Sequence, residues 1–583
     1  MRQRRKKGPN SSGDRAAKSA GPAKSPPIPA AGNSKYAGAA GAATAPHVSD
    51  SSLPHASDFT FKKNAGWAAI LLIIYGAVGT WGHFDFSNMM GYYDLLADAF
   101  LKGQLHIDIR PGEMYVHDMI PFEGRYYLQW GPLPALFHMA AKLISLTLSD
   151  RVACSLIAWL TTLVFWRIIS ILGRRYFPEL PSGLYPWFVM AFGLSTTTAV
   201  IGLRGTVYHE SIGMAALGVM LAVLGLLRYL EKSSWVWALV AGLGIAVAIG
   251  SRIPLALYGI GLGCGLLAVQ LLRRHSISTA IAHLTAYSIP ILVSGGLLLA
   301  YNQARFGSPW DYGADYLVDA VEGLNAFDLG RVPENIRHYL LALPQLTADF
   351  PWIGHVGWPP AENVTRLEDV SSIFLISPFL LLALLSWPLL GWKMTGWKML
   401  RSKKGAENGL PLFTVSLAVS SGLAFFAILC FAAAARRYAH DFVPVWMVLA
   451  FIGAGLHRHR VATLWSRWRG PAWATVAVCA LLHMHLSFTQ SFEWDPPDLN
   501  VMKSFVAASP AARRFMPIGP NWNEKEAIIR NDMGTYLLNS GQAREALEHF
   551  EWANRLMPNE PRIEQNLALA KRRAAIRQGG GPR

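Results

Sequence analysis

Seven carboxylates lie in one short stretch, residues 83–134, between two strongly apolar runs. They are Asp85, Asp94, Asp98, Asp108, Glu113, Asp118 and Glu123, and only Lys102, Arg110 and Arg125 oppose them. A carboxylate within hydrogen-bond reach of a hydroxyl can take its proton as a general base. The stretch is therefore the first place to expect chemistry, and the candidate bases are Asp94, Asp118, Asp98 and Asp85.

Local patterns place some of these candidates on expected elements. If residues 90–101 are helical, Asp94 and Asp98 are four residues apart and share one face, and Gly103 ends the helix. Asp118 precedes an expected turn at residues 123–125. A solvated surface helix is the plainer alternative for any single carboxylate of this kind.

The aromatic residues after the expected turn lead the chain back toward the next apolar run. They are Tyr126, Tyr127 and Trp130. Aromatic side chains at this depth are also typical of an ordinary interfacial belt, so they add little by themselves. Tyr127 is nevertheless included among the candidate substrate-binding residues.

The whole chain has the composition of a multi-pass membrane protein. Of its 583 residues 52% are hydrophobic and 15% are charged. Apolar runs recur near the length needed to cross a bilayer. The expected spans are 66–81, 152–172, 185–203, 212–227, 235–250, 255–272, 281–300, 373–392, 412–434, 442–456 and 472–488.

The net charge of +16 sits mainly in the N-terminal tail and in short loops. That distribution follows the positive-inside rule and argues against nucleic-acid binding. The four cysteines lie in apolar runs without paired spacing, so the sequence predicts neither a disulfide framework nor a zinc site. Residues 1–65 hold eleven lysines and arginines against three aspartates, a net +8, in an Ala/Gly/Ser/Pro background, which predicts a disordered cytoplasmic tail.

Five basic loops indicate the orientation of the spans. They contain Arg174/Arg175, Arg228/Lys232, Arg273/Arg274, residues 393–404 and residues 457–469, and all are expected in the cytoplasm. The loops 83–129 and 301–371 and the C-terminus then lie outside. The run 130–148 contains prolines, a histidine and a lysine, so we expect it to dip into the membrane or lie along it. About eleven crossings result from this topology.

Several expected span ends carry charges on the same outer face. They are Arg204, Glu210, Arg252, Arg305, Arg437 and Asp441. Each arginine could be a snorkelling anchor, but charges at span ends on one side favour a shared anionic ligand. An arginine-held phosphate beside carboxylates able to act as bases suits glycosyl transfer from a phosphate-linked donor.

The C-terminal stretch, residues 523–576, has an amphipathic helical pattern after an expected linker at 491–522. Gly534, Ala546, Phe550, Ala553 and Pro558 match the pattern of one tetratricopeptide repeat of about 34 residues. A single repeat cannot bury its own face, so it would pack on this chain or on a protein partner. An ordinary helical hairpin is the alternative.

Segments at 99–105 (AFLKGQL), 124–136 (GRYYLQWGPLPAL), 302–313 (NQARFGSPWDYG) and 436–444 (RRYAHDFVP) follow the basic tail and first span. In this order, residues 66–490 resemble the GT-C superfamily of membrane glycosyltransferases. The nearest group is family 39, with dolichyl-phosphate-mannose-protein mannosyltransferases and bacterial aminoarabinose transferases. The resemblance implies a mostly helical, polytopic fold in the bacterial inner membrane and a catalytic carboxylate in the loop after the first span.

The chain departs from the family pattern at two places. The family's carboxylate stands just before the aromatic helix, where this chain has Ser87-Asn88-Met89-Met90, so Asp85 and Asp94 are the nearest alternatives. The family's lysine before the paired prolines is Gln129 or Trp130 here. We therefore expect Arg125 or the other outer arginines to bind the phosphate of the donor.

These observations lead to the hypothesis of an inverting glycosyltransferase. It would move a sugar from a polyprenyl-phosphate donor to a glycan, lipid or protein acceptor on the outer face, with no metal or other cofactor. The rivals are a lipid-linked oligosaccharide ligase or polymerase, a transporter, and a non-catalytic envelope scaffold. A transporter should show matching repeats with broken spans, and none is visible in the sequence.

Overall fold

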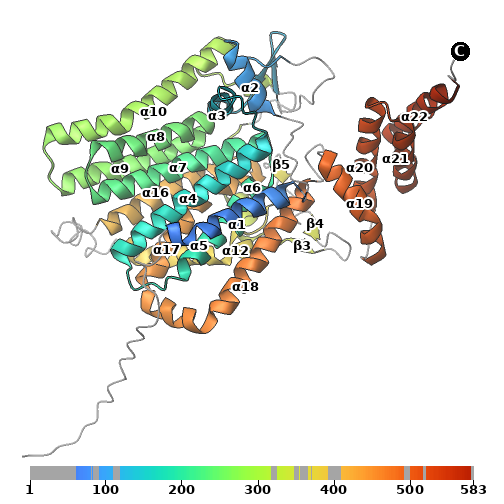
Figure 1. Ribbon diagram of the computed structural model, residues 1–583. Helices are drawn as coiled ribbons and strands as arrows, with labels where there is room; N and C mark the ends of the chain where they lie inside the picture. Colours follow the sequence, from blue (N-terminus) through green and yellow to red (C-terminus); the bar gives the residue numbers. More distant parts are fainter. Residues whose placement is uncertain are drawn as a thin grey trace, which may run out of the picture. The chain divides into compact units, whose positions relative to one another are not determined.

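The fold was analysed in a computed structural model, drawn in Figure 1. The structure describes residues 61–80, 82, 91–108, 119–316, 325–346, 353–354, 366–368, 370–390, 409–491, 499–515 and 520–579. Most of these residues are helical. The helices up to the long loop are α1 (Phe61–Gly79), α2 (Tyr92–Leu101), α3 (Leu133–Lys142), α4 (Asp150–Tyr176), α5 (Leu184–Leu194), α6 (Thr197–Leu203), α7 (Val207–Glu231), α8 (Trp235–Ser251), the 3-10 helix η2 (Ile253–Leu255), α9 (Ala256–Leu272) and α10 (Ile277–Phe306).

The multi-pass character expected from the sequence is confirmed in coarse form. Within the described residues, five helical segments are long and apolar enough to cross a membrane: Asp150–Tyr176, Val207–Glu231, Ile253–Leu272, Ile277–Phe306 and Leu410–Leu429. The bent pair of α5 and α6 can supply a sixth span. Shorter apolar helices are present at Gly66–Gly79, Trp235–Ser251, Pro378–Leu389 and Val443–Leu456. The figure of about eleven crossings stays a prediction.

Two expected spans are not continuous helices. The run 185–203 is divided into α5 and α6, which are bent by 57°. At the break, the Thr196 hydroxyl donates to the Phe192 carbonyl and accepts from the amide of Thr198. Hydroxyl side chains that satisfy backbone groups in this way compete with the helical ladder.

The run 373–392 is also irregular. Its described part consists of α12 (Ile373–Ile376), the 3-10 helix η6 (Pro378–Ser386) and α13 (Trp387–Leu390). Ser377, just before Pro378, has φ −144° and ψ 65°. A proline restricts the preceding residue and lacks an N–H, so the α-helix stops there.

Small residues allow α7 and α8 to lie side by side (Figure 1). A Cβ on Gly218 would lie 2.6 Å from the carbonyl oxygen of Gly244, and one on Gly225 would lie 2.7 Å from the amide nitrogen of Ala241. Close approach of small residues is a common way to pack helices in membranes. The contact aligns the first turn of α7 with the end of α8.

The described part of residues 83–142, which includes the first expected outer loop, contains α2, a β-hairpin and α3. Strands β1 (Met119–Phe122) and β2 (Arg125–Leu128) pair antiparallel, with Phe122 opposite Arg125. Glu123 and Gly124 both have positive φ, 48° and 73°, as the two-residue turn of a hairpin requires. The expected turn at 123–125 and the expected helix at 90–101 are both present, the helix beginning at Tyr92.

Helix α3 occupies the run expected to dip into the membrane. Its ten residues span only about 15 Å, too short to cross a bilayer. A Cβ on Gly131, just before α3, would collide with the carbonyl of Gly250 at the end of α8. The proline-containing segment is therefore held tightly against α8 and fixes where α3 begins.

The second expected outer loop, residues 301–371, contains short elements in its described part. Helix α10 continues to Phe306, so the loop begins at Gly307 and not at 301. Its described elements are η3 (Ala314–Tyr316), η4 (Leu329–Arg331), α11 (Val332–Ile336), the π-helical turn η5 (Arg337–Leu341), β3 (Gln345–Leu346), β4 (Ile353–Gly354) and β5 (Arg366–Glu368). Strand β3 pairs antiparallel with β4, and β5 pairs parallel with β6 (Ala433–Ala435).

Strand β6 leads into the short 3-10 helix η7 (Arg436–Asp441), between two apolar helices. These are α16 (Leu410–Leu429) and α17 (Val443–Leu456). The next helix, α18 (Arg458–Ser491), bends at Trp468, three residues before Pro471. It joins the expected basic loop 457–469 to the expected span 472–488.

The C-terminal part consists of α19 (Leu499–Phe515), α20 (Pro520–Asn539), α21 (Ala543–Leu556) and α22 (Pro561–Gly579). The stretch expected as a linker thus contains a helix, α19. Its apolar residues Met502 and Phe505 are three positions apart and pack with Trp522. Helices α20 and α21 form a hairpin in which the Phe550 ring lies against Gly534. The tetratricopeptide assignment itself stays a prediction.

Candidate functional site

Asp94 and Asp98 face Lys142 across the contact between α2 and α3. The Lys142 Nζ lies 2.9 Å from each carboxylate oxygen of Asp94 and 3.0 Å from Oδ1 of Asp98. The spacing of four residues puts both carboxylates on one face of α2, as the sequence predicts. The side chain of Asp98 is 45% exposed, whereas that of Asp94 is 19% exposed, so Asp94 is the more enclosed of the two.

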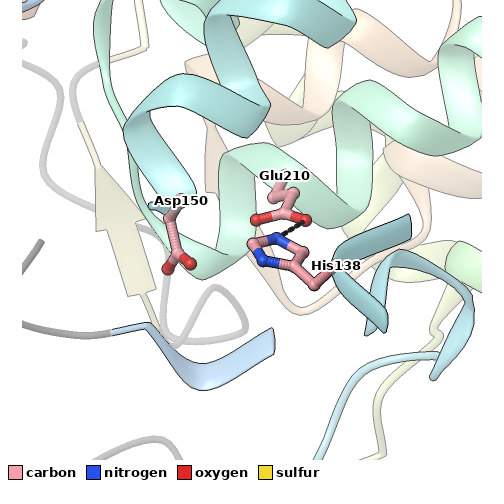
Figure 2. Close-up of side chains that lie close together, drawn as sticks. All are labelled: His138, Asp150 and Glu210. Carbon is pink, nitrogen blue, oxygen red and sulfur yellow. Dashed lines mark hydrogen bonds and ion pairs between the residues drawn. The ribbon is translucent and has the colours of Figure 1, made fainter. Parts of the chain in front are cut away.

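His138 lies one helical turn before Lys142 and joins α3 to α7. Its Nε2 is 2.8 Å from Oε1 of Glu210, and its Nδ1 is 3.7 Å from Oδ1 of Asp94. Both His138 and Glu210 are fully buried. Figure 2 shows the imidazole against the Glu210 carboxylate, with Asp150 beside them. One histidine therefore links a carboxylate of α2 to a carboxylate in the first turn of α7.

The neighbouring carboxylates stabilise the charged forms of both cations of α3. Burial lowers the pKa of His138, but the hydrogen bond and charge of Glu210 and the charge of Asp94 outweigh it and raise the pKa above 6.5. Burial also lowers the pKa of Lys142, and Asp94 and Asp98 more than reverse the effect. Both side chains are therefore suited to hold nearby anions.

Asp150 completes this group from the first residue of α4. Ligand atoms of His138, Asp150 and Glu210 all lie within 4.8 Å of one another, and all three residues are buried. Asp150 follows Ser149, whose hydroxyl accepts from the amide of Val152 and begins the helix. Glu210 is likewise in the first turn of its helix. The positive ends of two helix dipoles thus lie at these carboxylates and favour their ionised forms.

A second group of residues includes Tyr208 in the first turn of α7. Contacts join Tyr208, Tyr438, Arg252 and Arg437, and we call these four residues, together with Arg204 and Arg436 nearby in the sequence, the arginine cluster. The Arg437 guanidinium carbon is 4.6 Å from the Tyr208 ring centroid and 5.1 Å from that of Tyr438. The guanidinium carbon of Arg252 lies 4.9 Å from the centroid of the same Tyr438 ring. Arg204, Arg436 and Arg437 all act electrostatically on His209.

Within the arginine cluster, Arg252 has a carboxylate partner. Its Nε donates to Oδ1 and Oδ2 of Asp441 at 3.1 and 2.9 Å. The Tyr258 hydroxyl donates to the Asp441 carbonyl. Burial raises the pKa of the Asp441 carboxyl, and Arg252 offsets only part of that effect. The pair joins η7 to the C-terminal end of α8, because Arg252 directly follows the last residue of that helix.

Three other expected substrate-binding residues lie at the hairpin. Arg305 donates to the Leu128 carbonyl and to Asn302 Oδ1, both at 2.8 Å, and its guanidinium stacks on the Tyr301 ring at 3.9 Å. Tyr127 is buried with Phe306, and Arg125 is exposed at the tip of the hairpin. Arg305 and Tyr127 thus join the hairpin to α10.

The remaining candidate bases, Asp85 and Asp118, lie outside the described residues. Several site residues were not among the candidates from the sequence: His138, Lys142, Asp150 and Tyr208. The spacing of His138 and Lys142, four residues apart in an otherwise apolar run, was a usable signal. Asp150 was passed over because it precedes a span and resembles an ordinary helix start.

No family model and no curated protein match this sequence. Among solved structures, the chain is similar to ArnT from Cupriavidus metallidurans bound to undecaprenyl phosphate, with 14% identity and a TM-score of 0.39 over 89% of this chain and 79% of that one. It is also similar to AglB, the oligosaccharyltransferase from Archaeoglobus fulgidus, in complex with an inhibitory peptide and a dolichol-phosphate. That match has 12% identity and a TM-score of 0.36, over 74% of this chain and 56% of AglB.

Proposed function

We propose that this protein is an inverting glycosyltransferase that moves a sugar from a polyprenyl-phosphate donor to an acceptor hydroxyl at the outer face of the membrane. One observation carries the proposal. In the first turn of α7, Tyr208 contacts Arg437 of the arginine cluster. Two residues further on, Glu210 contacts His138 and so belongs to a second group, the carboxylate network of Asp94, Asp98, Asp150 and Glu210 with His138 and Lys142. An anion-binding group and a set of candidate bases therefore meet at the end of one apolar helix.

The arginine cluster would hold the donor phosphate. A guanidinium is planar, always charged and able to donate two parallel hydrogen bonds to a phosphate. Arg437 belongs to η7 and Arg252 follows α8, and both contact Tyr438. A phosphate bound here could therefore accept hydrogen bonds from arginines of two different elements. The lipid chain of the donor would lie among the apolar helices that carry these residues.

The carboxylate network would activate the acceptor. Asp94 is our choice for the base because it is partly enclosed and held by Lys142, yet retains some solvent access. It would take the hydroxyl proton while the acceptor oxygen forms a bond to the anomeric carbon. The bond from that carbon to the phosphate oxygen would break at the same time. The electron pair would leave with the polyprenyl phosphate, whose charge the arginines stabilise.

Binding of undecaprenyl phosphate, the chemical class of the released carrier, tests the anion site. The purified full chain should bind it in preference to undecaprenol, which lacks the phosphate. Arg437→Ala should weaken that binding at least about tenfold, the loss of a charge-assisted bond. Arg458→Ala is the matched control, because Arg458 pairs with Glu179 outside the cluster. Equal binding of the two lipids by the parental protein would refute the proposed site.

Lipid extracts test the reaction itself. Cells without the protein should accumulate a polyprenyl-phosphate sugar that cells with the protein consume. The Arg437→Ala variant should leave that lipid in place, and Arg458→Ala should not. Identical lipid profiles with and without the protein would contradict sugar transfer.

The outer-face location is a separate part of the proposal. A reporter active only outside the cytoplasm should be active when fused after Ser371 or Asp498, and silent when fused after Lys403. The expectation rests on the five basic loops, which the positive-inside rule places in the cytoplasm. Activity of the fusion at Lys403 would place the site residues on the cytoplasmic side.

A further inference from the structure

His138, Asp150 and Glu210 form a group whose arrangement is not explained by the proton transfer proposed for Asp94. Their ligand atoms lie within 4.8 Å of one another, and each comes from a different helix: α3, α4 and α7. Oε1 of Glu210 contacts Nε2 of His138, while its Oε2 makes no hydrogen bond, although Glu210 is fully buried. A buried carboxylate oxygen without a hydrogen bond is costly, and such groups need an explanation.

The donor set matches a cation of a particular class. One imidazole nitrogen and two carboxylate oxygens suit first-row transition metals, whereas Mg²⁺ favours oxygen ligands and retains several waters. Zn²⁺ binds nitrogen and oxygen ligands at about 2.0–2.2 Å, which places them roughly 3–3.5 Å from one another. The His138–Glu210 distance of 2.8 Å is close to that range already. One carboxylate oxygen of Asp150 lies within 4.8 Å of the ligand atoms of both His138 and Glu210.

The surrounding charges also favour a cation. Both carboxylates lie in the first turns of α4 and α7, where the helix dipoles favour negative charge, the form of a carboxylate that binds metals. Asp94 lies 3.7 Å from Nδ1 of His138 and can accept from that nitrogen when Nε2 is a ligand. Metal-bound histidines commonly have such a partner, which orients the ring.

We propose that His138, Asp150 and Glu210 bind one first-row divalent cation, such as Zn²⁺, between α3, α4 and α7. The sequence predicts no metal because the three residues are scattered along the chain and form no ligand motif. The ion would replace the hydrogen bond between His138 and Glu210 by two metal–ligand bonds. It would also lock the proline-led helix α3 onto two spans. The inference does not depend on sugar transfer.

Zn²⁺ alone is the probe. The purified full chain is stripped with a chelator, dialysed against Zn²⁺ and analysed for metal per chain. We expect one Zn²⁺ per chain, with an affinity at least about tenfold lower in Glu210→Gln and in Asp150→Asn, because each loses an anionic ligand. Glu334→Gln is the matched control: Glu334 contacts His338 at 3.2 Å, a similar imidazole–carboxylate pair with no assigned third ligand.

A second measurement needs no variant. Co²⁺ bound by nitrogen and oxygen ligands absorbs visible light, and Zn²⁺ should displace it from the parental protein with loss of that absorption. Equal Zn²⁺ binding by the parental protein, Glu210→Gln and Asp150→Asn would overturn the proposal, as would a parental protein that binds neither ion. His138 would then be the cation of the group, as an imidazolium. A protein that binds Zn²⁺ but transfers no sugar would refute only the proposed function.

Discussion

Glu210 and Glu526 are both fully buried carboxylates, yet their surroundings differ. Glu526, in α20, uses both oxygens: Oε1 accepts from Arg530 at 2.8 Å, and Oε2 accepts from Nε and Nη2 of Arg513 at 2.9 and 2.6 Å. Glu210 has His138 on Oε1 and no hydrogen bond on Oε2. A carboxylate whose oxygens are all satisfied by arginines holds helices together. One with an oxygen left over is placed for a ligand or a reaction.

The largest effect is expected in the carboxylate network around Glu210. Asp94→Asn keeps the shape of the side chain but removes the proton acceptor, so turnover should fall by about 10² to 10⁴. Sugar transfer by the purified full chain from its lipid donor is the measurement, with undecaprenyl phosphate binding as the control for the anion site. Asp98→Asn is the matched variant and should lose less, because Asp98 is more exposed. A larger loss in Asp98→Asn would make Asp98 the base.

The next effect separates the two glutamates. Glu526→Gln leaves Arg513 and Arg530 around a neutral group, and breaking a buried ion pair costs about 3 kcal/mol or more. We expect faster amide hydrogen exchange in α19, α20 and α21, measured on the full chain. In the metal-free chain, Glu210→Gln should change exchange in α7 far less, since it alters a single hydrogen-bonded contact, the one with His138. Similar losses in both variants would show that Glu210 is also a structural residue.

A smaller effect is expected where the outer loop meets the membrane helices. Gly131→Ala adds a methyl group that collides with the Gly250 carbonyl, so α3 and its His138 and Lys142 must shift. Misplacement of reacting groups by about 1 Å can cost up to 10² in rate, and we expect at least a tenfold loss of transfer. Gly296→Ala in α10 is the control, because no atom lies within 4 Å of the added methyl group. Equal activity of both variants would show that the close approach at Gly131 is unimportant.

The smallest effect is a pH dependence of the C-terminal helices. Burial raises the pKa of Glu526, but Arg530, Ser509 and Arg513 more than reverse this and bring it below 4.5. A carboxylate with a lowered folded-state pKa adds stability above its unfolded pKa, and that stability is lost as pH falls through the folded-state pKa. Proteolysis of α19–α22 should therefore quicken below about pH 4.5, and Glu526→Gln should reduce this dependence. An unchanged pH profile in the variant would assign the acid sensitivity to another group.

Local patterns account for the parts of the fold that depend on neighbouring residues. The helix bearing Asp94 and Asp98 and the two-residue turn at Glu123 and Gly124 follow from side-chain spacing and backbone preference. The two interrupted spans were missed for a related reason. Apolar length predicts a crossing, but Thr196 and Pro378 act on backbone hydrogen bonds that average hydropathy does not register.

The sequence by itself determined the apolar helices, the charged span ends and the shared face of Asp94 and Asp98, because each depends on residues a few positions apart. Only the tertiary structure decided which charges meet. His138 and Glu210 are 72 residues apart, and Arg252 and Asp441 are 189 apart. Such contacts depend on how α3 and η7 pack against α7 and α8, and no periodicity encodes that packing. The buried oxygen of Glu210, and with it the proposed metal site, follows from that packing.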